Sequence, residues 1–294
     1  MKILLGTPAH GGMVCLGYHE TVLRTLAAFR EDFPGIRFEN RSIVCSVLPL
    51  ARNILASMAL NDPSFTHLLF VDSDMGFSPS LIAKMIAFQK PVVGVVCPVK
   101  KFNYDWFHAS NMVYSNPMIA RLLANDYIGG QGAVITSTGP NGERQTQLVD
   151  GFVRVSYAGT GILLIHRNAL ETIKEKFPEL WVEEPGERYR QFGLEGGVLQ
   201  CFESIQGPDG LFLGEDISFC HRWIDTCGGE IWSCVDEAII HTGQENYIGQ
   251  YSLKMQLGDS LVSKSQIPSP SVRPIAELSP QFMREERLAM RHTK

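Results

Sequence analysis

The chain has 294 residues, of which 45% are hydrophobic, and it carries a formal net charge of −5. A chain of this length can bury a large core, as one α/β domain or as two fused halves. The excess of acidic residues disfavours a general binder of nucleic-acid backbones, which needs a basic face, but it does not exclude a local basic pocket for a diphosphate.

Strand and helix signals alternate along the first hundred residues. Continuous apolar runs at 67–71 and 92–96 are typical of strands buried on both faces of a sheet. Ser78 and Pro79 give an N-cap followed by proline at the first helical position, which predicts a helix that ends near residue 89. Further strands are expected at 2–6 and 42–47, and further helices at 50–60 and at 18–30, the latter with Val22, Leu23, Leu26 and Phe29 inward. This alternation predicts a mainly parallel central sheet with right-handed crossovers.

The pattern changes after Cys97. Residues 101–130 are rich in aromatic side chains and show no regular period, so irregular structure is expected there. Residues 133–138 and 145–158 flank Gly-Pro-Asn-Gly, which predicts a small antiparallel hairpin. Later strands are expected at 161–165, 231–235 and 238–240, and helices at 168–177 and 215–226, the last ended by Gly228 and Gly229. The tail from Ser260 is rich in Ser, Pro and charged residues, and only one short helix, beginning at Ser279, is expected in it.

Compartment signals favour a cytoplasmic protein. No run of 18 or more apolar residues occurs, so no transmembrane segment is predicted, and the opening six residues are too short for a signal peptide. The seven cysteines include no Cys-x-x-Cys pair, which suggests reduced thiols. Cys220, Cys227 and Cys234 recur every seven residues, but structural zinc sites use tighter spacing, so coincidence is favoured over a zinc site.

Two aspartates follow the strand predicted at 67–71. Asp72 and Asp74 flank Ser73, and side chains two apart on an extended chain point to the same side. Ligands of open α/β sheets bind outside the carboxyl ends of strands, and divalent cations prefer hard oxygen ligands. A plain polar turn is the alternative. The position after a buried strand favours a cation site.

Two later segments carry further candidates. Glu215 and Asp216 open a predicted helix, where acidic residues either stabilise the helix N-terminus or include a carboxylate that deprotonates a hydroxyl. His241 ends a predicted strand. A lone histidine is more often structural, but an imidazole that joins carboxylates suits Mn²⁺.

Residues at other strand ends suggest a nucleotide site. Thr7 and Pro8 precede two glycines at the end of the first strand, although the Gly-x-Gly-x-x-Gly fingerprint is absent. Arg52 could grip a diphosphate or could be a surface charge, and Lys100 follows another strand. The aromatic residues Phe102, Tyr104, Trp106 and Phe107 are expected to pack on the core rather than to stack on a sugar or base.

Together these motifs resemble the GT-A glycosyltransferases, in particular a bacterial and phage, family 2-like branch. The resemblance implies a GT-A fold, with a Rossmann-like, mainly parallel central sheet flanked by helices and a small antiparallel hairpin region. It places a glycosyltransferase domain at 1–258, with a nucleotide-binding half at 1–100 and an acceptor half at 101–258, before a tail at 259–294. The matching residues occur in the family's order: Thr7-Pro8, Ala51-Arg52-Asn53, Phe70-Val71-Asp72-Ser73-Asp74, Cys97-Pro98-Val99-Lys100, Gly159-Thr160-Gly161, Gly214-Glu215-Asp216 and His241-Thr242-Gly243.

The resemblance also implies roles for these residues. Asp74 and His241 would bind Mn²⁺ or Mg²⁺, and Asp72 would contact the ribose or the metal shell. Asp216, or with less support Glu215, would be the base on the acceptor hydroxyl. The donor, a UDP- or GDP-linked sugar, would be bound by Thr7, Pro8, Arg52, Asn53, Asp72, Ser73, Lys100, Gly159 and Gly161.

Three alternatives remain at this stage. A sugar nucleotidylyltransferase should carry a basic, Gly-rich loop near the N-terminus, and residues 7–13 contain no Lys or Arg. A non-catalytic nucleotide-sugar or carbohydrate binder would not need both metal ligands and a base. An enzyme that glycosylates modified DNA bases is disfavoured by the acidic balance. The acceptor, whether a glycan, a lipid or another hydroxyl compound, the stereochemistry and the oligomeric state stay open.

Overall fold

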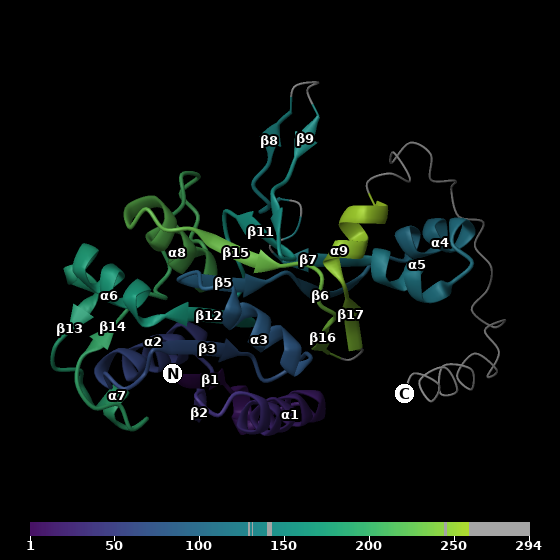
Figure 1. The fold of residues 1–294 in the computed structure, drawn as a ribbon. Coiled ribbons are helices and arrows are strands. Elements are labelled where there is room, and N and C mark those ends of the chain that lie inside the picture. Colours follow the sequence, from purple (N-terminus) through teal and green to yellow (C-terminus); the bar gives the residue numbers. More distant parts are fainter. Residues whose placement is uncertain (129, 131, 140–142, 244–245, 259–294) are drawn as a thin grey trace. The chain divides into compact units, whose positions relative to one another are not determined.

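The central sheet is built from the apolar runs of the sequence. The computed structural model describes residues 1–128, 130, 132–139, 143–243 and 246–258, all within one compact unit, Met1–Leu261. Within these residues eight strands form one sheet in the order β10-β11-β15-β5-β12-β3-β1-β2 (Figure 1). Their bounds are β1 Lys2–Pro8, β2 Arg37–Ile43, β3 His67–Val71, β5 Val92–Val95, β10 Leu148–Val149, β11 Phe152–Val155, β12 Ile162–His166 and β15 Ile231–Cys234.

The sheet is mainly parallel, as predicted. β1 pairs in parallel with β2 and β3, and β15 pairs in parallel with β5. β12 lies antiparallel between β3 and β5, and β11 lies antiparallel between β10 and β15. Six strands therefore point one way, and only β11 and β12 run against them.

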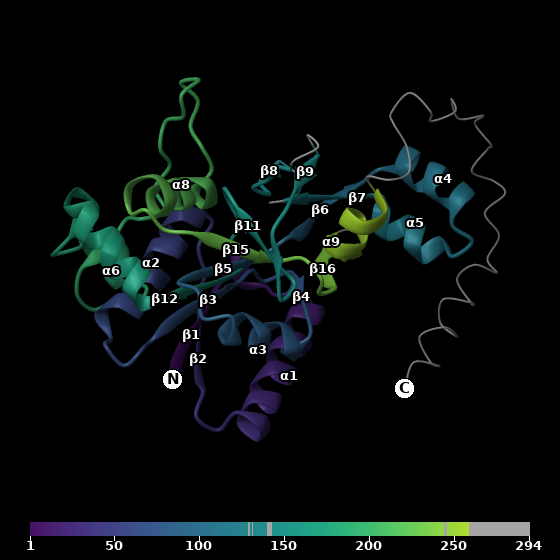
Figure 2. The ribbon, with the colours of Figure 1, turned by 45° about the horizontal axis from the view of Figure 1, so that its top comes forward.

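Helices cover both faces of the sheet (Figure 2). On one face α1 (Leu16–Asp32) and α3 (Pro79–Ala87) pack over Ile3 and Leu5, and on the other α2 (Leu48–Asn61), α6 (Arg167–Lys176) and α8 (Glu215–His221) pack over Leu4. Because side chains alternate along a strand, a continuous apolar run supplies both cores at once. No helix in the described part of the chain has the length and apolarity needed to cross a bilayer.

Smaller two- and three-stranded sheets accompany the central sheet. β4 (Met75–Gly76) pairs antiparallel with β16 (Ile239–Thr242), which pairs with β17 (Asn246–Gly249). β6 (Cys97–Phe102) pairs with β7 (Asn125–Ile128). The remaining elements are β8 Ser137–Thr138, β9 Arg144–Gln145, β13 Trp181–Val182, β14 Val198–Leu199, α4 Tyr104–Val113, α5 Pro117–Leu123, α7 Glu187–Arg190, α9 Tyr251–Leu253, the 3-10 turns η1 His10–Gly12 and η2 Pro178–Leu180, and the π turns η3 Arg222–Thr226 and η4 Lys254–Gly258.

The prediction of irregular structure at 101–130 is wrong. Helices α4 and α5 occupy much of this segment (Figure 1). Each begins at an asparagine cap: Asn103 Oδ1 accepts from the Trp106 amide at 3.0 Å, and Asn116 Oδ1 accepts from the Met118 amide at 2.9 Å. The caps were readable in the sequence, but the aromatic composition between them hid the helical period.

Smaller differences concern helix faces and loops. Leu23 was predicted to point inward, but it is 54% exposed, and Thr21 and Thr25 are buried in its place. The strand predicted at 42–47 ends at Ile43, and an exposed loop follows. The predicted hairpin forms as β8 and β9, whereas its turn at 140–142 and the predicted tail at 259–294 lie outside the described residues.

Candidate functional site

The Asp72–Asp74 turn lies at the carboxyl edge of β3 and is fixed through its backbone. The Asp72 amide donates to the Gly161 carbonyl at 2.9 Å. The Ser73 carbonyl accepts from the Cys15 amide at 2.8 Å, and the Asp74 carbonyl accepts from the Thr242 amide at 2.8 Å. Three segments from distant parts of the sequence thus hold one turn, so its two carboxylates are placed by the fold rather than by a mobile loop.

Arg52 joins two of the predicted acidic residues. Its side chain rises from α2 and is 3% exposed. Nη2 lies 3.3 Å from both oxygens of Asp72, and Nη1 donates to Glu215 Oε1 at 2.5 Å. Burial raises the pKa of the Asp72 carboxyl, although the Arg52 charge acts in the opposite direction. Arg52 is therefore an internal counterion of the site.

Asp74 faces two other basic side chains. Lys100 Nζ donates to Asp74 Oδ2, and His241 Nε2 lies 3.6 Å from the same oxygen. The pairing of β16 with β4 sets His241 opposite Met75 and so brings it beside Asp74. Burial alone would raise the pKa of Asp74, but the contacts with the protonated form of His241 and with Lys100 outweigh it and hold that pKa below its ordinary value.

A backbone carbonyl fixes the tautomer of His241. Nδ1 lies 2.8 Å from the Pro98 oxygen. Because a carbonyl oxygen only accepts, Nδ1 carries the hydrogen, and in the neutral ring Nε2 presents a lone pair toward Asp74. Metal-binding histidines commonly make such a bond from their other ring nitrogen.

Asp74 and His241 fit a divalent cation as a pair. A lone pair and a carboxylate that face each other repel unless a proton or another cation lies between them. Both oxygens of Asp72, in contrast, face Arg52, and no cluster of three His, Cys, Asp or Glu side chains suited to a metal occurs in the described ranges. Two protein ligands leave the remaining positions to ligand phosphates and water, as is usual for Mg²⁺ at phosphate-binding sites.

Asp216 lies near the glycine segment that precedes β12. A Cβ atom built on Gly159 would lie 3.8 Å from Asp216 Oδ2 and 3.0 Å from the Ile128 side chain, so the chain passes close to this carboxylate. Gly161 is under less steric pressure, because a Cβ atom there would meet Met75 at 3.5 Å. Between them Thr160 is buried, and its hydroxyl has no partner within the described residues. A side chain at position 159 would therefore crowd Ile128, and the glycine allows the backbone to pass close to Asp216.

Three predicted donor-site residues point into the fold. Thr7 is fully buried and its hydroxyl lies 2.5 Å from that of Tyr18, while Pro8 is also buried. Asn53 is fully buried. Its Oδ1 accepts from the Phe202 amide at 2.8 Å, and its Nδ2 donates to the Glu203 carboxylate at 2.8 Å. These side chains therefore pack inside the fold behind the site and stabilise the segments that form it.

The predicted residues therefore form a connected set. They make two groups of polar contacts, Arg52 with Asp72 and Glu215, and Asp74 with Lys100 and His241, and the turn that carries Asp72, half-buried Ser73 and Asp74 joins the two. The contact between Arg52 and Glu215 could not be predicted from the sequence, because 163 positions separate the two. The contact of His241 with the Pro98 carbonyl is equally non-local, across 143 positions.

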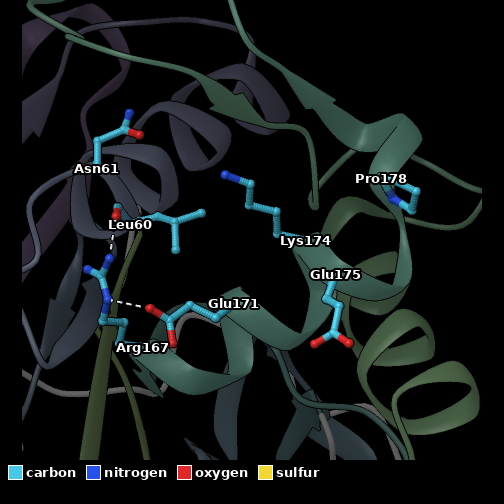
Figure 3. Close-up of a pocket in the computed structure, with 7 residues that line it drawn as sticks. All are labelled: Leu60, Asn61, Arg167, Glu171, Lys174, Glu175 and Pro178. Atoms are coloured by element: carbon cyan, nitrogen blue, oxygen red, sulfur yellow. Dashed lines mark hydrogen bonds and ion pairs between the residues drawn. The ribbon is translucent and has the colours of Figure 1, made fainter.

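A separate pocket of about 390 Å³ lies at the opposite end of the sheet (Figure 3). It is lined by Leu60, Asn61, Arg167, Glu171, Lys174, Glu175 and Pro178. The fold itself uses two of its cations: Arg167 donates to three carbonyls at the end of α2, and Lys174 Nζ lies 3.3 Å from the centre of the Trp181 ring. Its charges serve packing and do not converge on a ligand position.

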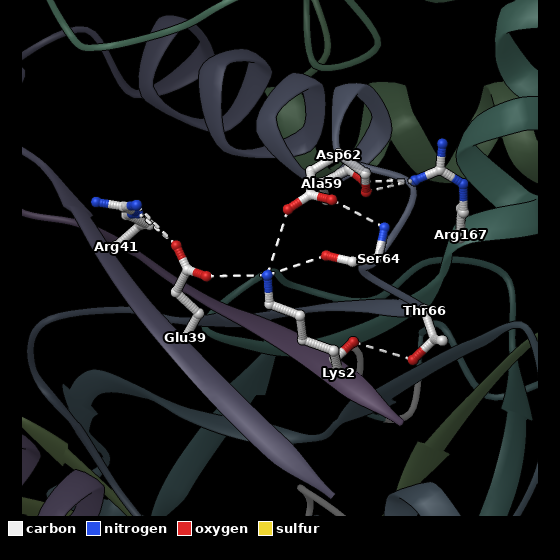
Figure 4. Close-up of polar contacts among 8 residues, drawn as sticks. All are labelled: Lys2, Glu39, Arg41, Ala59, Asp62, Ser64, Thr66 and Arg167. Carbon is white, nitrogen blue, oxygen red and sulfur yellow. Dashed lines mark hydrogen bonds and ion pairs between the residues drawn. The ribbon is translucent and has the colours of Figure 1, made fainter.

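The same end of the sheet holds a partly exposed network around Lys2 (Figure 4). Lys2 Nζ bonds Ser64 at 3.0 Å and pairs with Glu39 at 3.1 Å and Asp62 at 3.3 Å. Arg41 pairs with the same Glu39 at 2.7 Å. The network ties β1 and β2 to the end of α2 and lies far along the strands from the Asp72–Asp74 turn.

Comparisons with known proteins leave the function to be argued from the site. No protein-family model and no curated protein matches the chain. Solved structures with some likeness include A197 from STIV, at 15% identity and TM-score 0.40, covering 83% of this chain and 86% of that one. Another is a putative glucose-1-phosphate thymidylyltransferase from Bacillus anthracis in complex with a sucrose, at 13% identity and TM-score 0.30, covering 64% of this chain and 78% of that one.

Proposed function

We propose that the protein is a metal-dependent glycosyltransferase that moves a sugar from a nucleoside-diphosphate donor to a hydroxyl acceptor. The observation that carries the proposal is the convergence of Asp74, His241 and Lys100 at the carboxyl edge of β3, with Asp216 beside the neighbouring glycine segment. A carboxylate, an oriented imidazole and an ammonium at one point suit a diphosphate held with a cation. A separate carboxylate nearby suits proton transfer.

Asp74 and His241 would hold Mn²⁺ or Mg²⁺, and Asp72 would serve the metal shell or the ribose from its position against Arg52. When bound, the cation neutralises the charge that develops on the departing diphosphate. Lys100 supplies a second positive charge on the same side. Thr7, Pro8, Asn53 and the backbone around Ser73 shape the walls against which a UDP- or GDP-linked donor would lie.

Asp216 would accept the proton of the acceptor hydroxyl as that oxygen attacks the anomeric carbon. Its neighbour Glu215 is a weaker choice, because its carboxylate accepts from Arg52 at 2.5 Å and is held away from an incoming proton. Gly159 allows the backbone to pass close to Asp216, and the acceptor would bind beside this carboxylate. Transfer with inversion follows directly from this role; with retention, Asp216 would position the acceptor instead.

Incubation with UDP- and GDP-sugars tests the proposal. Release of nucleoside diphosphate by sugar transfer or by slow donor hydrolysis, dependent on Mn²⁺ and lost in EDTA, is the expected result. Metal-dependent binding of a nucleotide-sugar without any release, across a broad acceptor panel, would identify a non-catalytic binder instead.

A further inference from the structure

Lys100 occupies the carboxylate oxygen that a metal would need. Its ammonium donates to Asp74 Oδ2, the oxygen that also faces His241 Nε2 at 3.6 Å. The three side chains come from three segments: the turn after β3, strand β6 and strand β16. An ammonium and a divalent cation beside this carboxylate repel each other, so each weakens the binding of the other.

Lys100 is held loosely enough to leave. Its side chain is 40% exposed, whereas that of Asp74 is 24% exposed. An ion pair with one exposed partner contributes little to stability, and a lysine ammonium sits on a flexible stem that can rotate toward another anion. A diphosphate bound beside the turn is such an anion, since its charge exceeds that of one carboxylate.

We propose that Lys100 is a built-in counterion of Asp74 that competes with the metal in the donor-free protein and moves to the diphosphate when donor and metal bind. The inference rests on the proposed function and adds a mode of regulation to the same site. Metal alone then binds weakly, because it must displace Lys100 into water. With nucleotide present the displaced ammonium gains a new partner, so nucleotide and metal each strengthen the binding of the other, by the same factor.

Electron paramagnetic resonance of free Mn²⁺ measures this coupling without any turnover. The titration uses the full chain, alone and with UDP or GDP, for the wild type, Lys100→Met and Lys100→Gln. Lys101→Met is the matched control, because Lys101 is the adjacent lysine, is 75% exposed and forms a long ion pair of 3.7 Å with Asp126. Circular dichroism checks that each variant is folded.

Without nucleotide, both Lys100 variants should bind Mn²⁺ about tenfold more tightly than the wild type, the equivalent of 1.4 kcal/mol. Lys101→Met should match the wild type, and adding Asp74→Asn to Lys100→Met should remove the gain. The nucleotide should strengthen Mn²⁺ binding in the wild type and much less in the Lys100 variants. Equal Mn²⁺ affinity in the wild type and both Lys100 variants, or no binding in any of them, would overturn the inference.

The same titrations separate this inference from the proposed function. Tighter Mn²⁺ binding in the Lys100 variants, with no nucleotide bound by any protein, would support the counterion role and contradict the nucleotide-sugar donor. Metal-dependent nucleotide binding with unchanged Mn²⁺ affinity in the variants would support the nucleotide-sugar donor and contradict the counterion role.

Discussion

Arg52 and Glu215 meet at 2.5 Å although they lie 163 residues apart, one on α2 and the other at the start of α8. Because Arg52 also contacts both oxygens of Asp72, a single buried guanidinium links α2, the end of β3 and the first turn of α8. Removing one member of a buried ion pair leaves the other uncompensated, which costs far more than losing an exposed pair.

Replacing Arg52 should therefore destabilise the whole domain. Arg52→Met is expected to lower the free energy of unfolding by about 3 kcal/mol, because Asp72 and Glu215 are left without their counterion. Arg41→Met is the control, since Arg41 is 58% exposed in its pair with Glu39 and should change stability by less than about 1 kcal/mol. Urea unfolding measures both. Equal, small effects would show that Arg52 is not a structural counterion.

The adjacent carboxylates Glu215 and Asp216 should respond differently to loss of charge. Asp216→Asn is expected to lower the rate of sugar transfer about 10²- to 10⁴-fold while nucleotide binding survives, because the base is lost and the donor site is not. Glu215→Gln should instead lower the melting temperature, because it weakens the bond from Arg52. Thermal unfolding and nucleotide titration of both variants check this. Loss of nucleotide binding in Asp216→Asn would place Asp216 in the donor site.

His67 should make stability depend on pH. Burial and the nearby His166 ring, 4.6 Å away, lower the pKa of His67 from 6.5 to about 4. The folded state then binds the proton less readily than the unfolded chain. The contribution of neutral His67 to the free energy of unfolding is therefore complete above the unfolded pKa of 6.5, and it is lost as the pH falls toward 4.

The expected loss is about 2 kcal/mol of unfolding free energy between pH 7 and pH 5. His67→Gln should flatten the pH dependence in this interval, where most carboxylates remain ionised. Urea unfolding at both pH values compares the variant with the wild type. An unchanged slope in the variant would show that His67 is not the titrating group.

Strand ends were predictable from the sequence because burial on both faces leaves a continuous apolar run. His67–Val71 follows this pattern, and it places Asp72 and Asp74 at the sheet edge. The position of His241 beside them could be expected only as another strand end, since the β16–β4 pairing that brings it there is non-local. Short sequence patterns thus predict where each strand ends, but only the pairing of distant strands determines which strand ends lie together.

The roles of Arg52 and Asn53 could not be predicted in the same way. Both lie on a helix whose position relative to α8 and Glu203 depends on packing of the whole domain. A basic residue beside a predicted phosphate site is equally compatible with gripping a ligand or with neutralising buried carboxylates. Only the burial of the Arg52 side chain, at 3% exposed, distinguishes the two.

Calorimetric titration of UDP, GDP and CDP, each with Mn²⁺ and with EDTA, tests the donor site most directly. The protein should bind one of the three nucleotides with Mn²⁺ and lose that binding in EDTA. Asp74→Asn should lose it too while remaining folded, and Asp126→Asn, which changes a carboxylate that is 43% exposed, should keep it. Binding that is absent for all three nucleotides, or is unaffected by EDTA and by Asp74→Asn, would contradict a metal-dependent nucleotide-sugar site at this turn.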